Sequence, residues 1–122
     1  MMVFPMKKSN IFSKIDQAKI DEKVGIGISE IVKGENVSFH IAVVKDKVRE
    51  HYHKERDEIY YIVKGKGILK VDDEKSAVTD GDVILIPKGS KHSLRNLEDE
   101  PLILVFISAP PFAPERDRFF TE

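Results

Sequence analysis

Residues 58–73 read EIYYIVKGKGILKVDD and contain two short apolar runs, Ile59–Val63 and Ile68–Val71. Only the segment Lys64-Gly65-Lys66-Gly67 separates these runs, and Asp72-Asp73 follows the second one. Each run has the length of a strand, and each break is made of residues that favour tight turns. The stretch therefore predicts two consecutive strands joined by a tight turn.

The same alternation of short apolar runs and turns extends to both sides of this stretch. Apolar residues alternate with polar ones from Val24 onward, and further apolar runs lie at 83–86 and 102–107. The segments between these runs are too short for the helices that parallel β-α-β units require. The pattern predicts one antiparallel β-sandwich or barrel over residues 24–108.

Two terminal segments flank this region. In the N-terminal segment, 1–23, the stretch Ser9–Lys19 carries apolar residues at imperfect helical spacing, which predicts a short amphipathic helix or turn. The tail, 109–122, contains prolines that lack the amide donors of a central strand, and it ends near the apolar pair Phe119-Phe120. We therefore expect an extended arm that packs over the barrel or onto a second copy of the chain.

Composition narrows the range of functions. The chain of 122 residues has the size of one domain, and its 20 basic and 21 acidic residues give a net charge of −1, which argues against nucleic-acid or membrane binding. It contains no cysteine, so disulfides, thiol nucleophiles and thiolate metal sites are excluded. The apolar start at 1–6 is too short for a secretory signal, and we expect a cytoplasmic protein.

Four residues have a spacing that suits a metal site. His51 and His53 are two residues apart, so strand alternation puts both imidazoles on one face. Glu58 begins the next apolar run, where a hairpin would return its carboxylate toward the pair, and His92 supplies a third imidazole after a turn. Three imidazoles and one carboxylate suit one divalent transition metal ion, Zn, Mn, Fe, Ni or Cu, rather than Ca or Mg.

The spacing of these residues resembles that of the two motifs of the cupin superfamily. The matching residues are His51, His53, Glu58 and Gly65 for the first motif, and Gly81, Pro87, Gly89, His92 and Asn96 for the second. Lys45 stands where the first motif usually opens with glycine. The sequence resembles mannose-6-phosphate isomerase-like cupins, and this resemblance implies an all-β double-stranded β-helix (jelly-roll) barrel whose interior holds the metal.

Some motif residues have a structural explanation of their own. Gly65 and Gly81 fall where the chain reverses, and such positions favour a positive φ. Asn96 is suited to closing a turn by hydrogen bonding to its own backbone. We expect these three residues to shape loops rather than to bind a ligand.

Strand alternation also nominates two residues for catalysis. Arg49 lies two residues before His51, and Tyr60 lies two residues after Glu58, so both side chains are expected on the metal's side. Arg49 could hold a carboxylate or phosphate, or form a salt bridge at the barrel rim, and Tyr60 could act in proton transfer or simply pack in the core. His40 alternates with apolar residues and is expected to be half-buried or on the surface, outside the ligand set.

The resemblance leaves the reaction open, because cupins share a site but differ in chemistry. The first hypothesis is a metalloenzyme similar to sugar-phosphate isomerases, with Glu58 as the base if it leaves the metal, and otherwise Tyr60 or a bound water. The alternatives are a metal-dependent dioxygenase and a non-catalytic small-molecule or metal-binding module. The expected partners are a small anionic or sugar-like substrate and, as the resemblance implies, a second copy in a homodimer.

Overall fold

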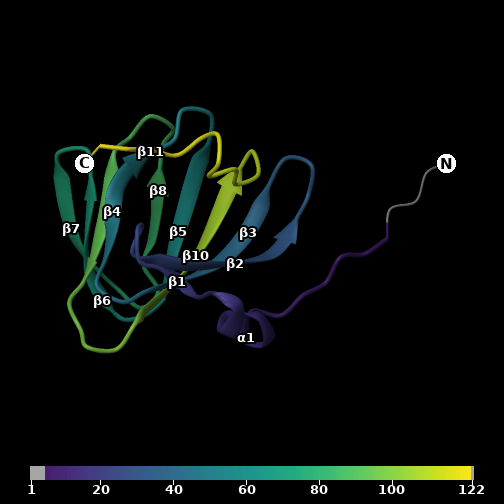
Figure 1. The fold of residues 1–122 in the computed structure, drawn as a ribbon, viewed down its shortest axis with the longest axis horizontal. Helices are drawn as coiled ribbons and strands as arrows, with labels where there is room; N and C mark the ends of the chain where they lie inside the picture. Colours follow the sequence, from purple (N-terminus) through teal and green to yellow (C-terminus); the bar gives the residue numbers. More distant parts are fainter. Residues whose placement is uncertain (1–4, 122) are drawn as a thin grey trace.

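The computed structural model describes residues 5–121, so the first four residues of the predicted N-terminal segment lie outside it. Strands dominate the described chain and face one another in two sheets (Figure 1). The elements in chain order are α1 (Ile11–Lys14), the 3-10 helix η1 (Ile15–Gln17), β1 (Ile20–Asp21), β2 (Ile26–Lys33), β3 (Ser38–Val44), β4 (Lys47–Tyr52), β5 (Asp57–Lys64), β6 (Lys66–Val71), β7 (Glu74–Thr79), β8 (Val83–Ile86), β9 (His92–Asn96), β10 (Leu102–Ala109) and β11 (Phe119–Phe120).

The topology is that of a jelly roll. One sheet has the order β1-β2-β3-β10-β5-β8, and the other has the order β11-β4-β9-β6-β7. Every strand pair is antiparallel. The chain passes repeatedly from one sheet to the other, so sequence neighbours such as β4 and β5 lie in different sheets. These observations confirm the predicted all-β barrel of the double-stranded β-helix type.

The apolar core lies between the two sheets. Inward side chains such as Ala42, Val44, Ile62, Leu94 and Leu104 are at most 1% exposed. Full burial of each larger aliphatic side chain stabilises the fold by roughly 1.5–3 kcal/mol relative to exposure. This packing holds the strands rigidly and thereby fixes the positions of polar side chains at one end of the barrel.

The turn residues behave as the sequence predicts. Gly65 and Gly81 adopt positive φ values of 126° and 89°. The side chain of Asn96 accepts a hydrogen bond from the amide of Glu98 at 2.9 Å, which closes the predicted turn. A further left-handed glycine, Gly25 with φ 88°, lies so close to the carbonyl of Lys47 that a Cβ there would be 1.8 Å from its oxygen.

The N-terminal helix is shorter and less packed than expected. Only α1 and η1 form within the predicted stretch, and neither contains a buried residue. Phe12 is 77% exposed, whereas Ala18 just after η1 is buried. In the part of the chain that the structure describes, no helix is long and apolar enough to span a membrane.

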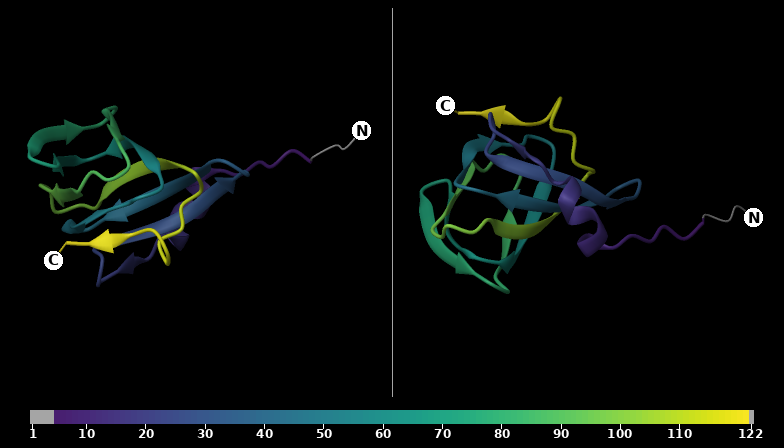
Figure 2. Two further views of the ribbon diagram at one scale, coloured as in Figure 1. Left: turned by 90° about the horizontal axis from the view of Figure 1, so that it is seen from above. Right: turned by 60° about the horizontal axis from the view of Figure 1, so that its bottom comes forward.

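The C-terminal arm, defined here as residues 110–121, runs as an extended segment across the polar end of the barrel (Figure 1, yellow; Figure 2). Phe112 and Phe120 pack against the core. The arm ends as β11, in which Phe119 pairs with Tyr52 and Phe120 pairs with His51 on β4. The predicted arm is therefore present and lies over its own barrel.

Candidate metal centre

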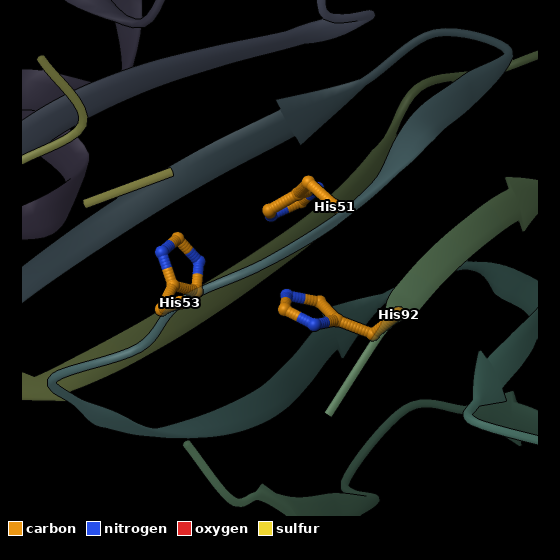
Figure 3. Close-up of side chains that lie close together, drawn as sticks. All are labelled: His51, His53 and His92. Carbon is orange, nitrogen blue, oxygen red and sulfur yellow. The ribbon is translucent and has the colours of Figure 1, made fainter. Parts of the chain in front are cut away.

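Three predicted ligands converge at the end of the barrel that the arm covers. His51 lies near the end of β4, His53 follows that strand directly, and His92 begins β9 as the cross-strand partner of His51. One ring nitrogen from each histidine lies within 4.8 Å of the other two. The three rings point toward a common space (Figure 3). All three are buried, with 5% exposure or less.

Backbone carbonyls determine which ring nitrogens face this space. Nδ1 of His51 hydrogen-bonds the carbonyl of Arg49 at 2.7 Å, and Nδ1 of His92 hydrogen-bonds that of Ser90 at 2.9 Å. Nδ1 of His53 makes the same bond to the carbonyl of Asp117 at 2.5 Å. A carbonyl oxygen only accepts, so each Nδ1 carries the hydrogen and each neutral ring keeps a lone pair on Nε2. This is the tautomer that a metal-ligating histidine requires.

Glu58 adds a carboxylate to the same space. Its Oε1 lies 3.2 Å from Nε2 of His53 and 3.4 Å from Nε2 of His92. These three buried atoms have no hydrogen-bond partner among the described residues. Because all three are acceptors in the tautomers above, they repel one another unless a cation or a proton lies between them. The residues present therefore fit one metal ion with nitrogen and oxygen ligands.

Burial and the closeness of these groups to one another shift the pKa values of His51, His53 and Glu58. Burial, with help from His92, lowers the pKa of His51 to about 3, so this ring is neutral at pH 7. Burial alone would raise the pKa of Glu58, but the neighbouring imidazoles of His53 and His92 outweigh it and lower the value to about 2. Burial alone would lower the pKa of His53, but the Glu58 carboxylate outweighs this effect, and the pKa of His53 is raised. The imidazole of His53 and the carboxylate of Glu58 thus each favour the charged form of the other.

Tyr60 lies beside these ligands in the barrel interior. It is 4% exposed, and its ring centroid lies 6.0 Å from that of His92. Burial raises the pKa of its hydroxyl well above the usual value, so the phenol is neutral. Together with His51 and Glu58, it lines a small inner cavity. Tyr60 is thus positioned beside the ligands, as strand alternation predicts.

Arg49 does not follow simple alternation. Val48 pairs with Leu94 and His51 pairs with His92, so β4 has one more residue than β9 between these pairs. This bulge puts both Val48 and His51 inside the barrel although they are three residues apart. The guanidinium of Arg49 lies 4.3 Å from the ring centroid of Phe120, and Arg49 does not line the inner cavity.

Comparison with known sequences identifies the family. The sequence profile of the cupin domain matches residues 38–108, which is more than half of the chain. The chain belongs to the cupin family. An uncharacterized protein of Methanocaldococcus jannaschii is 38% identical to this cupin over 87 residues, which are 70% of each protein. Protein SchB of Streptomyces halstedii is 35% identical over 63% of this chain and 56% of its own length.

Solved structures show the same fold. KdgF from Halomonas sp. has a TM-score of 0.80 at 17% identity, over 91% of this chain and 99% of that one. The nucleoside dehydratase Pac13, from Streptomyces, has a TM-score of 0.76 at 18% identity, over 97% of this chain and 92% of its own. At such identities the likeness establishes the jelly-roll fold of this cupin and leaves its substrate open.

A buried ion pair that the sequence did not predict fastens the arm of this cupin to the loop after β4. Nε of Arg56 donates to the carboxylate of Asp117 at 2.6 Å, and its guanidinium also donates to the carbonyls of Pro110 and Pro111. The same carboxylate accepts the amide hydrogens of Lys54 and Glu55. Burial alone would raise the pKa of Asp117, but the hydrogen bonds from Arg56 and from these amides outweigh this effect, and the pKa is lowered. This ion pair between Arg56 and Asp117, called the clip below, fixes the position of the Asp117 carbonyl, which orients the ring of His53.

Two neighbouring spaces with shared wall residues lie beside the predicted ligands of this cupin. The inner cavity has a volume of only about 20 Å³, and the outer chamber has a volume of about 430 Å³. The residues that line both spaces are Val24, Ile26, Ile28, Phe112 and Arg118. His40 also lines the outer chamber and is only 2% exposed, so it is more deeply buried than expected, and it lies outside the three-histidine cluster.

Proposed function

We propose that this cupin is a metalloenzyme that holds one divalent transition metal ion on His51, His53 and His92, with Glu58 as a further ligand. The observation that carries the proposal is the set of three Nδ1 hydrogen bonds to backbone carbonyls. These bonds direct three Nε2 lone pairs to one buried space, beside a carboxylate oxygen that also lacks a hydrogen-bond partner. Such an arrangement is expensive to bury without a cation.

The reaction we favour is proton transfer on a small polar metabolite, as in the sugar-phosphate isomerases that the sequence resembles. A bound ion would supply polarisation of a carbonyl or hydroxyl oxygen. Tyr60 keeps its proton at neutral pH and can donate it at the wall of the inner cavity. Glu58 can accept a proton when it is not bound to the ion. The rings of Phe106 and Phe112 form an apolar part of the wall of the same cavity.

Metal uptake is the first test. Purified protein, stripped of metal and titrated in turn with Zn(II), Mn(II), Fe(II), Ni(II) and Cu(II), should bind one equivalent of ion. The variants His53→Ala and His92→Ala should lose that uptake. His40→Asn is the matched control because it alters a buried histidine outside the cluster, and it should keep a full equivalent. Unchanged affinity in either alanine variant would show that the residue is not a ligand.

The reaction class is tested separately with the metal-loaded protein. Sugar phosphates and hydroxy acids are incubated in deuterium oxide, and carbon-bound deuterium is followed by NMR. Incorporation that is greatly slowed in Tyr60→Phe supports proton transfer by this hydroxyl. Substrate-dependent oxygen consumption would instead establish the dioxygenase alternative. Binding without either signal would make the protein a non-catalytic module.

A further inference from the structure

Two buried nitrogen atoms at the outer chamber lack hydrogen-bond partners among the described residues. One is Nδ1 of His40 on β3, and the other is Nε of Arg118 on the C-terminal arm. Both residues line the outer chamber, and Arg118 also lines the inner cavity. Buried polar atoms are normally satisfied, so a pair of exceptions in one chamber calls for a ligand.

The ring of His40 is held in place by its neighbours. It stacks on Phe106 with 4.5 Å between ring centroids and 7° between planes, and it meets the ring of Phe112 edge to face. Its Nε2 lies 2.7 Å from the hydroxyl of Ser38, which also accepts the amide hydrogen of Phe112 at 2.8 Å. Only Nδ1 is therefore left to bind a ligand. Burial keeps the pKa of this imidazole near 4, so the ring is neutral and can accept or donate one hydrogen bond.

Arg118 brings a positive charge into the same chamber. Its guanidinium lies 5.2 Å from the ring centroid of Phe120, and burial lowers its pKa, against the opposing effects of Asp21, Glu115 and Glu58. A guanidinium remains charged at neutral pH and offers a planar fork of donors to a carboxylate or phosphate. Because Nε is buried without a partner, an anion in the chamber would satisfy it.

We propose that the outer chamber binds a small metabolite whose carboxylate or phosphate pairs with Arg118 and whose neighbouring hydroxyl or carbonyl hydrogen-bonds Nδ1 of His40. This inference rests on the proposed function and specifies its substrate class, since the chamber and the inner cavity share walls. The other charged residues of the chamber wall are Lys19, Asp21 and Glu30, so an anion has to pair directly with a cation there to offset the two carboxylates. The chamber therefore assigns to Arg118 the role that the sequence suggested for Arg49.

Binding to the metal-free protein tests this site independently of the metal centre. Metal is removed with a chelating resin, because soluble chelators are themselves anions. Glycolate, a hydroxy carboxylate, and inorganic phosphate are titrated by calorimetry, with ethylene glycol as the uncharged control. The Nε–H signal of Arg118 and the imidazole signals of His40 are followed by NMR. We expect glycolate, phosphate or both to bind and shift these signals, and ethylene glycol to leave them unchanged.

Matched variants assign the binding to the two residues. Arg118→Met should weaken anion binding at least about tenfold, the loss expected for a charge-assisted hydrogen bond, and Arg118→Lys should restore part of it. Arg116→Met is the control, because Arg116 lies on the same arm but is exposed and pairs with Glu55 at 3.3 Å. At His40, glutamine can keep the bond to Ser38 but leaves the Nδ1 position empty, so His40→Gln should weaken glycolate about two- to tenfold.

The outcomes separate this inference from the proposed function. No binding of either anion, or equal losses in Arg118→Met and Arg116→Met, would overturn the anion site. Unchanged glycolate affinity in His40→Gln would remove His40 from it. Zn(II) affinity should be the same in Arg118→Met and wild type. A protein that binds anions through Arg118 but takes up no metal would retain the site and refute the metalloenzyme, and metal uptake without anion binding would do the reverse.

Discussion

Nδ1 of His53 hydrogen-bonds the backbone carbonyl of Asp117, 64 residues further along the chain, at 2.5 Å. The corresponding partners of His51 and His92 lie only two residues before them. Of the three convergent histidines, His53 is thus the one whose ring orientation depends on the C-terminal arm. Since Asp117 is also the buried partner of Arg56, the same residue fastens the arm and orients a predicted metal ligand.

Breaking the ion pair should destabilise the fold strongly. Asp117→Asn leaves the Arg56 side chain, which is 0% exposed, without its countercharge. Removing one partner of a buried pair costs about 3–5 kcal/mol, and urea unfolding of the metal-free protein measures this loss. Glu55→Gln is the control, because its exposed pair with Arg116 is worth less than about 1 kcal/mol. Similar losses in the two variants would contradict the role given to the clip.

The same substitution should also weaken metal binding. Displacement of the arm removes the acceptor at Nδ1 of His53, and loss of such an outer contact typically lowers metal affinity about 10- to 100-fold. Competition with a chromophoric chelator measures Zn(II) affinity at a temperature at which Asp117→Asn is folded by circular dichroism. Wild-type affinity in the folded variant would show that the arm does not orient this ligand.

Deleting residues 110–122 should lower the melting temperature without changing the mass in solution. The apolar pair that suggested a dimer contact, Phe119-Phe120, pairs with β4 of the same chain. The homodimer remains a prediction, and we expect its contact to lie outside the arm. Light scattering on the full and shortened proteins measures the mass. A shift from dimer to monomer on truncation would show that the arm contributes to the dimer interface.

The stability of the protein should fall in acid partly because of His40. Burial lowers the pKa of His40 from 6.5 to about 4. Glu30 and Glu58 partly oppose this shift, and Lys33 adds to it. Between these two pH values the unfolded chain binds the proton and the folded chain does not, so the free energy of unfolding falls as the pH falls. The contribution amounts to about 3 kcal/mol at most and is fully present above pH 6.5. Metal-free His40→Gln should lose less stability than wild type between pH 7 and 4.5, and parallel curves would contradict this.

Alanine substitutions at two glycines with positive φ, Gly81 and Gly25, distinguish the cost of backbone strain from the cost of a steric clash. Alanine at Gly81, which has open space around it, should cost about 1–2 kcal/mol for the positive φ alone. Alanine at Gly25 meets the same strain and also the carbonyl oxygen of Lys47, and should cost about 3 kcal/mol or more. Thermal unfolding compares the variants. Equal losses would mean that the loop at Gly25 moves aside freely.

Sequence periodicity was sufficient to predict the barrel, and the resemblance to the cupin motifs predicted the convergence of the histidines. Alternation places His51 and His53 on one face, and the motif spacing implies that Glu58 and His92 join them. A bulge interrupts the alternation in β4, and a single extra residue leaves no recognisable mark in composition or spacing. A bulge is decided by pairing with β9, which lies more than forty residues away in sequence.

The chamber could not be predicted in the same way. Nothing in the sequence around Arg118 or Asp117 distinguishes them from other charged residues of a polar tail. Their positions depend on the ion pair with Arg56 and on the packing of Phe112 and Phe120 against the core. The burial of His40 likewise depends on aromatic rings from β10 and from the arm.

The two parts of the candidate site come from different stretches of the chain. The predicted metal ligands lie between residues 51 and 92, inside the matched profile of 38–108. Apart from His40, the residues that line the outer chamber belong to 19–30 and 112–118, outside that profile. Substitutions in these terminal stretches can change the shape and charge of the chamber while the ligand set is retained. The residues that bind the substrate can therefore change during evolution while the predicted metal ligands stay the same.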